Sequence, residues 1–415
     1  MPGHGNREVR QEIPQLGEEM DMADRSVLLS SNYNAWPEPF NGQAYAFLNV
    51  IAQVEDADFL MPGPAPHSAG RGVNPSLGYL WHELSHRVMS QAWRRLGRPG
   101  LSNATPVTVT RDYDVFLFVC QFPLELTALR RMKNWRKRCG KAYAYLLEGW
   151  PERFPHQAQE LRMLDAFDHV FVLNAESIPA LRQYTSTPIS FLPSACDTLL
   201  ACPYPDTPAR SIDVLSLGRR IPELHTKLAA LAARDGNFFY VHDVLKAGAV
   251  VDWAEHRSQS AAMIKRAKYF IAYDFTVDTV GVFKGVRKNA LATRYFEGTA
   301  GGAIVLGSRQ QCPEFADHFD WPDAVIELPP GTPDLGAFFR DLGSQTERLE
   351  RARATNVSQA LLRHDWAHRW DQLLDTVGLP RSARLQQRIE QLASMAGMVE
   401  VAHGAPRVRR HDVTA

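Results

Sequence analysis

Residues 284–308, KGVRKNALATRYFEGTAGGAIVLGS, hold a basic cluster, a helix-compatible run and a buried-strand run in close succession. The apolar residues of NALATRYFEGTA recur at helical spacing, and the pair Gly301-Gly302 ends that run as a C-cap does. The run AIVLG that follows is short and continuously apolar, which is typical of a strand buried on both faces. The stretch therefore predicts a helix that leads through two glycines into a parallel strand.

The same helix carries the residue types of an anion site. Arg287 and Lys288 precede it, and its N-terminus is predicted near Asn289. Unpaired backbone N–H groups and the helix dipole make such an N-terminus attractive to anions. Glu297 stands about two turns further along, where a carboxylate can accept hydrogen bonds from sugar hydroxyls. We expect a nucleotide diphosphate to lie across this helix; the alternative is an ordinary amphipathic helix that feeds a strand.

The rest of the chain alternates strand-like and helix-like runs on both sides of a proline-rich segment, PYPDTPARS, at residues 203–211. The strand-like runs include SVLLSS, DVFLFVC, AYAYLLEGW and HVFVLN before this segment, and IDVLSLG, FFYVHDV and YFIAYDF after it. Such alternation favours parallel sheets with right-handed crossovers, and it predicts an α/β protein of two tandem Rossmann-like domains. The expected divisions are a flexible tail at 1–24, an N-terminal domain at 25–203, a C-terminal domain at 204–362, bracing helices at 363–400 and a flexible tail at 401–415.

The helix and strand of the opening stretch match a family pattern. The order Glu297, Ala300, Gly302, Val305 resembles the "E-x-x-A-x-G-x-x-V" donor-binding segment of GT-B glycosyltransferases of the retaining group 1, or family 4, type. Asn289 stands where the better-known form of that pattern has a first glutamate, so the role of that acid is open. Distant members of the group, which resemble spore-maturation glycosyltransferases, carry Asn at this position.

Further matches lie on both sides of that segment. Those distant members also carry an Arg before the aromatic residue and the Glu, as Arg294 does here. Arg219 follows a predicted strand and resembles the family's Arg that pairs with the donor diphosphate, a task suited to a bidentate guanidinium. Lys227 comes later than the family's usual lysine. LPSACD, which ends at Asp197, and the HDW and RW pairs near the C-terminus resemble the family's linker and C-terminal signatures.

The resemblance implies a GT-B fold in which a C-terminal helix crosses back to the first domain. It implies transfer of a sugar from a nucleotide diphosphate-sugar to an acceptor, with retention and with neither an essential metal nor another cofactor. The acceptor stays open: a glycan, a lipid-linked molecule or a small molecule. The donor-binding residues that the resemblance implies are Arg219, Lys227, Lys288, Asn289, Arg294, Glu297, Gly301 and Gly302.

The N-terminal half, which would be the acceptor side, shows no clear catalytic group. Glu148, in LLEGW, ends a predicted strand and is the weak candidate for that role, because ligands of such sheets gather at the carboxyl ends of the strands. The alternative is an ordinary surface acid. A GT-B module without catalysis, which binds a nucleotide sugar or a partner, is the second functional hypothesis.

Two other motifs point to metal chemistry. His82, Glu83 and His86 form an HExxH pattern, which on a helix places two imidazoles on one face for zinc. No third ligand follows at the expected spacing, so a zinc metalloprotease is a lesser alternative, and whether this motif binds metal stays open. The DxD pattern at 56–58, which holds a metal in GT-A glycosyltransferases, is interpreted as a loop.

Charge and composition indicate which classes of partner and which cell compartment to expect. Lysine and arginine together number 46, as do aspartate and glutamate, so no bulk charge favours nucleic acid. Five scattered cysteines without a CxxC pair, no secretory signal and no long apolar run predict a cytoplasmic protein with reduced thiols. The basic cluster at 130–141, predicted to be helical, is either a solvated helix face or a peripheral contact with anionic lipid at the inner membrane face.

Overall fold

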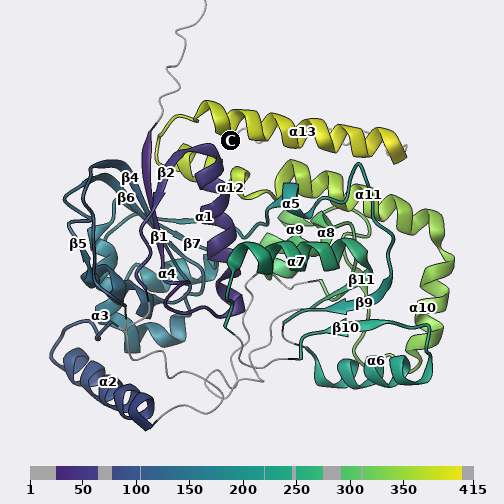
Figure 1. Ribbon diagram of the computed structural model, residues 1–415, viewed down its shortest axis with the longest axis horizontal. Helices are drawn as coiled ribbons and strands as arrows, with labels where there is room; N and C mark the ends of the chain where they lie inside the picture. Colours follow the sequence, from purple (N-terminus) through teal and green to yellow (C-terminus); the bar gives the residue numbers. More distant parts are fainter. Residues whose placement is uncertain are drawn as a thin grey trace, which may run out of the picture.

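The computed structural model describes residues 25–63, 77–102, 104–218, 220–244, 249–273, 291–309 and 312–403. Two parallel sheets lie side by side, each covered by helices (Figure 1). The strand order is β2-β1-β4-β6-β7-β8 in the first sheet and β10-β9-β11-β12-β13 in the second. Every neighbouring pair in both sheets is parallel. The predicted α/β class with two tandem Rossmann-like halves is confirmed.

The strands follow the apolar runs of the sequence closely. Those of the first sheet are β1 (Ser26–Ser31), β2 (Asp56–Phe59), β4 (Tyr113–Cys120), β6 (Cys139–Leu146), β7 (His169–Val172) and β8 (Ile189–Phe191). Those of the second sheet are β9 (Ile212–Ser216), β10 (Tyr240–His242), β11 (Ala267–Ala272), β12 (Ile304–Gly307) and β13 (Ile326–Glu327). The central strands are buried along most of their length, as expected of parallel strands covered on both faces.

The helices fill the connections and the C-terminal end. The longer ones are α1 (Gly42–Val54), α2 (Leu77–Arg95), α6 (Pro222–Arg234), α7 (Trp253–Arg266), α8 (Thr293–Ala300), α10 (Leu335–Ser344), α11 (Thr346–Arg363), α12 (Trp366–Thr376) and α13 (Ala383–His403). Short helical turns complete the set: η3 (Pro123–Arg131), α3 (Ala158–Leu161), α4 (Ile178–Leu181), α5 (Thr198–Ala201) and α9 (Pro313–His318). No helix among the described residues is long and apolar enough to cross a membrane.

Three local predictions were wrong. The basic cluster at 130–141 is not a helix: η3 ends at Arg131, the two-residue strand β5 (Met132–Lys133) pairs with β3 (Val107–Thr108), and β6 follows a turn. Asn134 in that turn has a φ of 65°, a conformation that breaks a helix. The DxD pattern lies in the edge strand β2 rather than in a loop. The helix of the opening stretch begins at Thr293 instead of near Asn289.

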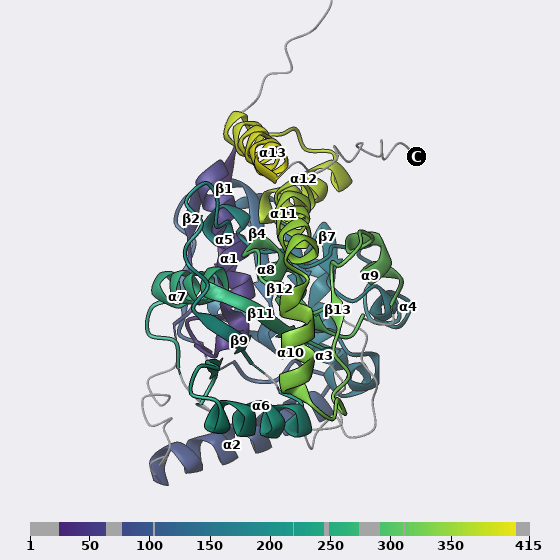
Figure 2. The ribbon, with the colours of Figure 1, turned by 90° about the vertical axis from the view of Figure 1, so that its right-hand side faces the viewer.

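The C-terminal helices cross back to the first half, as expected from the GT-B resemblance. α12 and α13 both pack on α1, and α13 spans the top of the molecule (Figures 1 and 2). Trp366 packs on Phe47 with ring centroids 4.9 Å apart, and Trp370 Nε1 donates to Glu55 Oε1 over 2.7 Å. Both tryptophans are fully buried, so a large apolar contact fixes the crossing.

A buried ionic network ties the same helices to the segment that joins the two sheets. Arg388 of α13 donates to Asp365 Oδ1 over 2.9 Å and to Asp197 Oδ1 over 2.9 Å. Asp365 also caps α12 through Ala367 N and accepts a hydrogen bond from Thr198 N. The two sequence motifs that contain Asp197 and Asp365 therefore meet in space and brace the fold.

Candidate functional site

The two halves of the molecule touch at the N-terminus of α8. Thr293, the first residue of α8, donates through Oγ1 to Gln43 Oε1 of α1 over 2.9 Å. Ser194, which follows β8, donates to Thr293 Oγ1 over 3.4 Å. The N-terminus of α8 in the second half therefore lies against the N-terminus of α1 in the first half. Ligands of open α/β sheets bind at such helix starts, which follow the carboxyl ends of strands.

Glu297, one turn further along α8, forms a buried ion pair with Arg257 of α7. Their side chains are 13% and 18% exposed, respectively, so solvent screens the pair only weakly. Burial alone would lower the pKa of Arg257, but the Glu297 carboxylate outweighs it and the pKa is raised. The guanidinium is thus permanently charged, and it fixes one carboxylate oxygen of Glu297 in place.

Gly42, at the start of α1, lies against this arginine. A Cβ at position 42 would lie 3.4 Å from both Cδ and Nη1 of Arg257, which is ordinary van der Waals contact. The ion pair therefore sits at the contact between the two halves. Sequence reasoning missed Arg257 because nothing in AEHRSQS distinguishes it from a surface arginine on an amphipathic helix.

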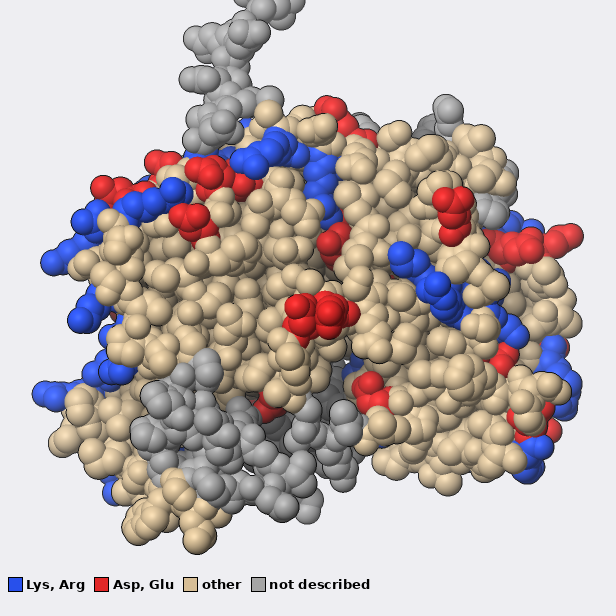
Figure 3. All heavy atoms as spheres, in the orientation of Figure 1, with Lys and Arg blue, Asp and Glu red and all other residues tan. Residues whose placement is uncertain are grey.

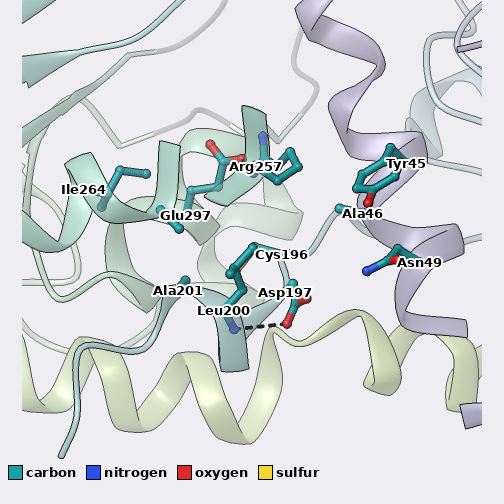
Figure 4. Close-up of a pocket in the computed structure, with 11 residues that line it drawn as sticks. Tyr45, Ala46, Asn49, Cys196, Asp197, Leu200, Ala201, Arg257, Ile264 and Glu297 are labelled. Atoms are coloured by element: carbon teal, nitrogen blue, oxygen red, sulfur yellow. Dashed lines mark hydrogen bonds and ion pairs between the residues drawn. The ribbon is translucent and has the colours of Figure 1, made fainter. Parts of the chain in front are cut away.

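A small cavity lies beside the ion pair (Figure 4). Tyr45 and Asn49 of α1 face it from one side, and Arg257 and Glu297 face it from the other. Asp197 borders it from below. Its volume is about 30 Å³, which suits about two water molecules and not a nucleotide. The cavity is therefore too small to hold a nucleotide itself.

Arg294, three residues before Glu297, lies under the turn that leads from β9 to α6. Gly218 in that turn has a φ of +73°, and a Cβ there would lie 3.8 Å from the Arg294 guanidinium. Gly218 N donates to Asp243, at the carboxyl end of β10. Burial lowers the pKa of Arg294, against the opposing effect of the Glu297 and Asp243 carboxylates. A positive charge thus sits beneath a glycine turn with left-handed backbone.

Histidines surround the same turn on its α6 side. Arg220 contacts His242 Nδ1 over 2.7 Å, and His225 Nδ1 lies 3.0 Å from the Tyr240 hydroxyl. The pKa of His225 is lowered by burial first, and by the charge of Arg220 second. Lys227, by contrast, pairs with Glu223 over 2.9 Å and donates to the Thr332 carbonyl over 3.2 Å, which ties α6 to the loop before α10.

The remaining donor-side predictions divide into two groups. Arg219, Lys288 and Asn289 lie outside the described residues. Gly301 and Gly302 form the turn between α8 and β12: a Cβ on Gly301 would lie 2.4 Å from Ile264 Cγ2 of α7, and Gly302 has a φ of +65°. Their contacts pack α8 against its neighbours at the end opposite Thr293.

Glu148, the acceptor-side candidate, lies two residues beyond β6. It accepts hydrogen bonds from Gln121 Nε2 over 2.7 Å and from Trp150 Nε1 over 3.3 Å. Glu125 is buried close by, and its pKa is raised to about 8, by burial first and by the Glu148 charge last, against the backbone N–H groups of Gln121 and Phe122. Glu125 is therefore largely protonated at neutral pH. Gln121 N and Phe122 N donate hydrogen bonds to its carboxyl group, and nothing in the sequence FPLE marks these contacts.

Of the two metal motifs, the structure describes the DxD pattern in full and the HExxH pattern only in part. Asp56 pairs with Arg111 over 3.9 Å, and Asp58 pairs with Arg111 over 3.1 Å and accepts from the Tyr113 hydroxyl over 2.7 Å. Within the described residues, no three His, Cys, Asp or Glu side chains are grouped to hold a metal ion. The side chains of His82 and Glu83 are not among them. All five cysteines are buried and none forms a disulfide.

Residues 219–375 match a protein family described as glycosyl transferase-like. This range contains α6 to α8 and most of the second sheet, including Arg294 and Glu297. The resemblance to GT-B glycosyltransferases is confirmed, while its spore-maturation branch is not singled out. No match was found among curated protein sequences.

Solved structures resemble most of the chain at low identity. The N-terminal domain of Candida albicans trehalose-6-phosphate phosphatase is 8% identical, with a TM-score of 0.51 over 87% of this chain and 98% of that one. A UDP-forming alpha,alpha-trehalose-phosphate synthase from Burkholderia vietnamiensis is 10% identical, with a TM-score of 0.47 over 85% and 99%. An alpha-glucosyltransferase solved with UDP-glucose and DNA is 8% identical, with a TM-score of 0.49 over 86% and 100%. At such identities the first likeness supports the fold alone.

Proposed function

We propose that the chain is a glycosyltransferase that uses a nucleotide diphosphate-sugar donor, bound between the two halves. The arrangement of Arg294 and Glu297 carries this proposal. The two residues lie three positions apart on α8, so they project from the same side of the helix. One lies under the Gly218 turn and the other is held by Arg257. A cation and an oriented carboxylate at this spacing suit a diphosphate and a sugar hydroxyl, respectively.

The diphosphate would lie at the Gly218 turn and the N-terminus of α8. Arg294 supplies a fixed positive charge there, and Arg219 and Lys288 are placed by the sequence in the segments that adjoin the turn and the helix. Cations and backbone N–H groups that are already in position stabilise the negative charge that develops on a leaving diphosphate. In this scheme the arginines and the lysine serve in place of a metal ion, and transfer would proceed with retention.

Glu297 would bind the donor ribose or the transferred sugar. Arg257 holds Oε1, so the second carboxylate oxygen is oriented to accept a hydrogen bond from a hydroxyl. Arg257 is thus a positioning residue, because it acts on the donor through Glu297. On the acceptor side, Glu148 is fixed by Gln121 and Trp150 at the carboxyl end of β6, where it can contact an acceptor hydroxyl.

We also propose the division into an acceptor-side domain at 25–203, a donor-binding domain at 204–362 and bracing helices at 363–400. The first sheet lies within 26–191 and the second within 212–327. The proline-rich segment 203–211 joins them. Expression of 25–203 alone should give an unstable product, since α1 would lose its contacts with Trp366 and Trp370.

Release of nucleoside diphosphate from a panel of nucleotide sugars tests the proposed function. Glu297→Ala and Arg294→Met should each lower release at least about tenfold with folding intact. Arg351→Met is the matched control, because its exposed pair with Glu347 lies on α11. Activity should persist in a metal chelator. Full activity in both site variants would refute the site, and nucleotide binding without turnover would favour the non-catalytic module.

A further inference from the structure

The helix α2 turns two polar side chains toward the protein. Ser90 Oγ accepts a hydrogen bond from Leu101 N over 3.1 Å, and Arg94 pairs with the fully buried Glu160 over 2.6 Å. Trp93 packs under the Arg130 guanidinium, 5.3 Å from the ring centroid. A helix of a globular protein normally turns its apolar stripe toward the core.

The opposite face of α2 is a stripe of large apolar side chains open to solvent. These side chains, with their exposed fractions, are Leu77 (83%), Leu80 (47%), Trp81 (71%), Leu84 (57%) and Val88 (58%). Their spacing of three, four and seven residues puts them on one side of the helix. Such a contiguous exposed patch indicates an interaction surface, whereas a scattered exposed apolar residue does not.

Basic residues flank the C-terminal end of this stripe. Arg95, Arg130, Arg131 and Lys133 are all exposed. Arg130 donates to the Pro99 carbonyl over 3.0 Å and Arg131 donates to the Ala104 carbonyl over 3.2 Å. Because carbonyl oxygens are uncharged, these hydrogen bonds orient the guanidinium groups without neutralising them. Lys and Arg side chains gather along the same edge of the first half (Figure 3).

Two arginines in the later part of the basic cluster are offset by carboxylates. Arg136 pairs with Asp168 over 3.3 Å, and Arg138 pairs with Asp112 over 3.0 Å. Arg130 and Arg131, next to α2, donate to backbone carbonyls and keep their full charge. This places an apolar stripe and a basic flank side by side on one surface.

We propose that α2 is an interfacial anchor that docks the protein on an anionic lipid bilayer. The apolar stripe would enter the boundary between headgroups and acyl chains, with Trp81 at headgroup level. The basic flank would bind lipid phosphates, and two such signals together give stable peripheral binding. A second copy of the chain is a poorer occupant, because it would cover the apolar stripe and leave the basic flank without an anionic partner.

The position of α2 gives the docking a consequence for catalysis. In two perpendicular views α2 lies at the same edge of the molecule as α6, the helix that follows the Gly218 turn (Figures 1 and 2). If the proposed function holds, docking through α2 brings the donor site near the membrane surface, where a lipid-linked acceptor is presented. The docking itself needs neither donor nor turnover.

Flotation of the full chain with vesicles, without any nucleotide, tests the anchor. The wild-type chain should float with phosphatidylcholine–phosphatidylglycerol vesicles and much less with phosphatidylcholine alone, and high salt should weaken binding. Leu84→Glu should lower the partition coefficient at least about tenfold, because one apolar contact is lost and one repulsive charge is gained. Val401→Glu is the matched control: Val401 is 80% exposed on α13 and should not affect binding.

Three results would overturn the anchor. The wild-type chain could fail to bind either vesicle, Leu84→Glu could bind as the wild type does, or Val401→Glu could lose as much binding as Leu84→Glu. Light scattering on the same samples measures the oligomeric state, and so tests whether a second copy of the chain covers the apolar stripe. A wild-type dimer that Leu84→Glu converts to a monomer, together with no vesicle binding, would show that α2 pairs with a second copy. None of these outcomes depends on whether the chain transfers sugars, because the flotation assay contains no nucleotide.

Discussion

Replacing Arg388 with alanine tests how the C-terminal helices are held on the rest of the chain. The Arg388 side chain is 7% exposed, and it contacts Asp365, which is fully buried, and Asp197, which is 14% exposed. Arg388→Ala leaves the two carboxylates in a dry site without their cation. Breaking a buried ion pair in this way costs about 3–5 kcal/mol of unfolding free energy.

Urea denaturation followed by circular dichroism measures this cost. Arg381→Ala is the matched control, since Arg381 on the same segment pairs with Asp371 over 2.7 Å but is 50% exposed. The exposed pair should contribute at most about 1 kcal/mol. A loss in Arg388→Ala no larger than the loss in Arg381→Ala would refute the reasoning that the buried network braces the fold.

The cost of Arg388→Ala should also depend on pH. In the wild type, burial would raise the pKa of Asp365, but Arg388 outweighs it and the pKa is lowered. A carboxyl with a lowered folded pKa contributes stability above its unfolded pKa, about 4, and that contribution is lost as pH falls through the folded pKa. Without Arg388 the buried carboxyl protonates more readily, so the difference between variant and wild type should shrink as pH approaches 4. A difference that grows toward pH 4 would contradict this account.

Three further predictions concern packing, pH and the acceptor side. Gly301→Val should lower the unfolding free energy by about 1–3 kcal/mol, because the new side chain would overlap Ile264. Gly331→Ala is the control, since its Cβ would lie in open space and should change stability little. Equal urea midpoints for the two variants would contradict this prediction. The pKa of His318 is lowered to about 3, by burial first and by the charge of Arg369 next. The unfolding free energy should therefore fall as pH drops below about 6.5, the pKa of an unfolded histidine. His318→Gln should make that fall less steep in urea titrations at a series of pH values. Glu148→Gln should keep nucleotide binding but lower transfer, and unchanged transfer in an acceptor assay would remove it from the site.

Much of the fold followed from local patterns. Continuous apolar runs such as residues 115–120 predicted buried strands, because few other structures bury every residue of so short a run. Gly301-Gly302 marked the end of α8, and the HDW signature marked the start of α12. The element boundaries that were predicted wrongly depend on contacts between residues distant in sequence. Asn134 and the pairing of β3 with β5 prevent a helix in the basic cluster, and no local pattern predicts a two-residue parallel pairing.

The site could be predicted only in part, since its geometry depends on contacts distant in sequence. Glu297 and Arg294 were found from a motif, but the partner of Glu297 is an arginine on another helix. The sequence of α2 is amphipathic, yet its period could not tell which face meets the protein. Arg94 turns toward the protein because it pairs with the buried Glu160.

The most direct test of the proposed donor site is a thermal-shift screen of the purified chain against UDP, GDP, ADP, dTDP and CMP, each with and without its sugar. At about a hundred times its dissociation constant, the correct nucleotide should stabilise the wild-type chain by nearly 3 kcal/mol. The same nucleotide should stabilise Arg294→Met much less and Arg351→Met as much as the wild type. Stabilisation by none of these nucleotides, or equal stabilisation of Arg294→Met, would contradict a nucleotide-sugar site at α8.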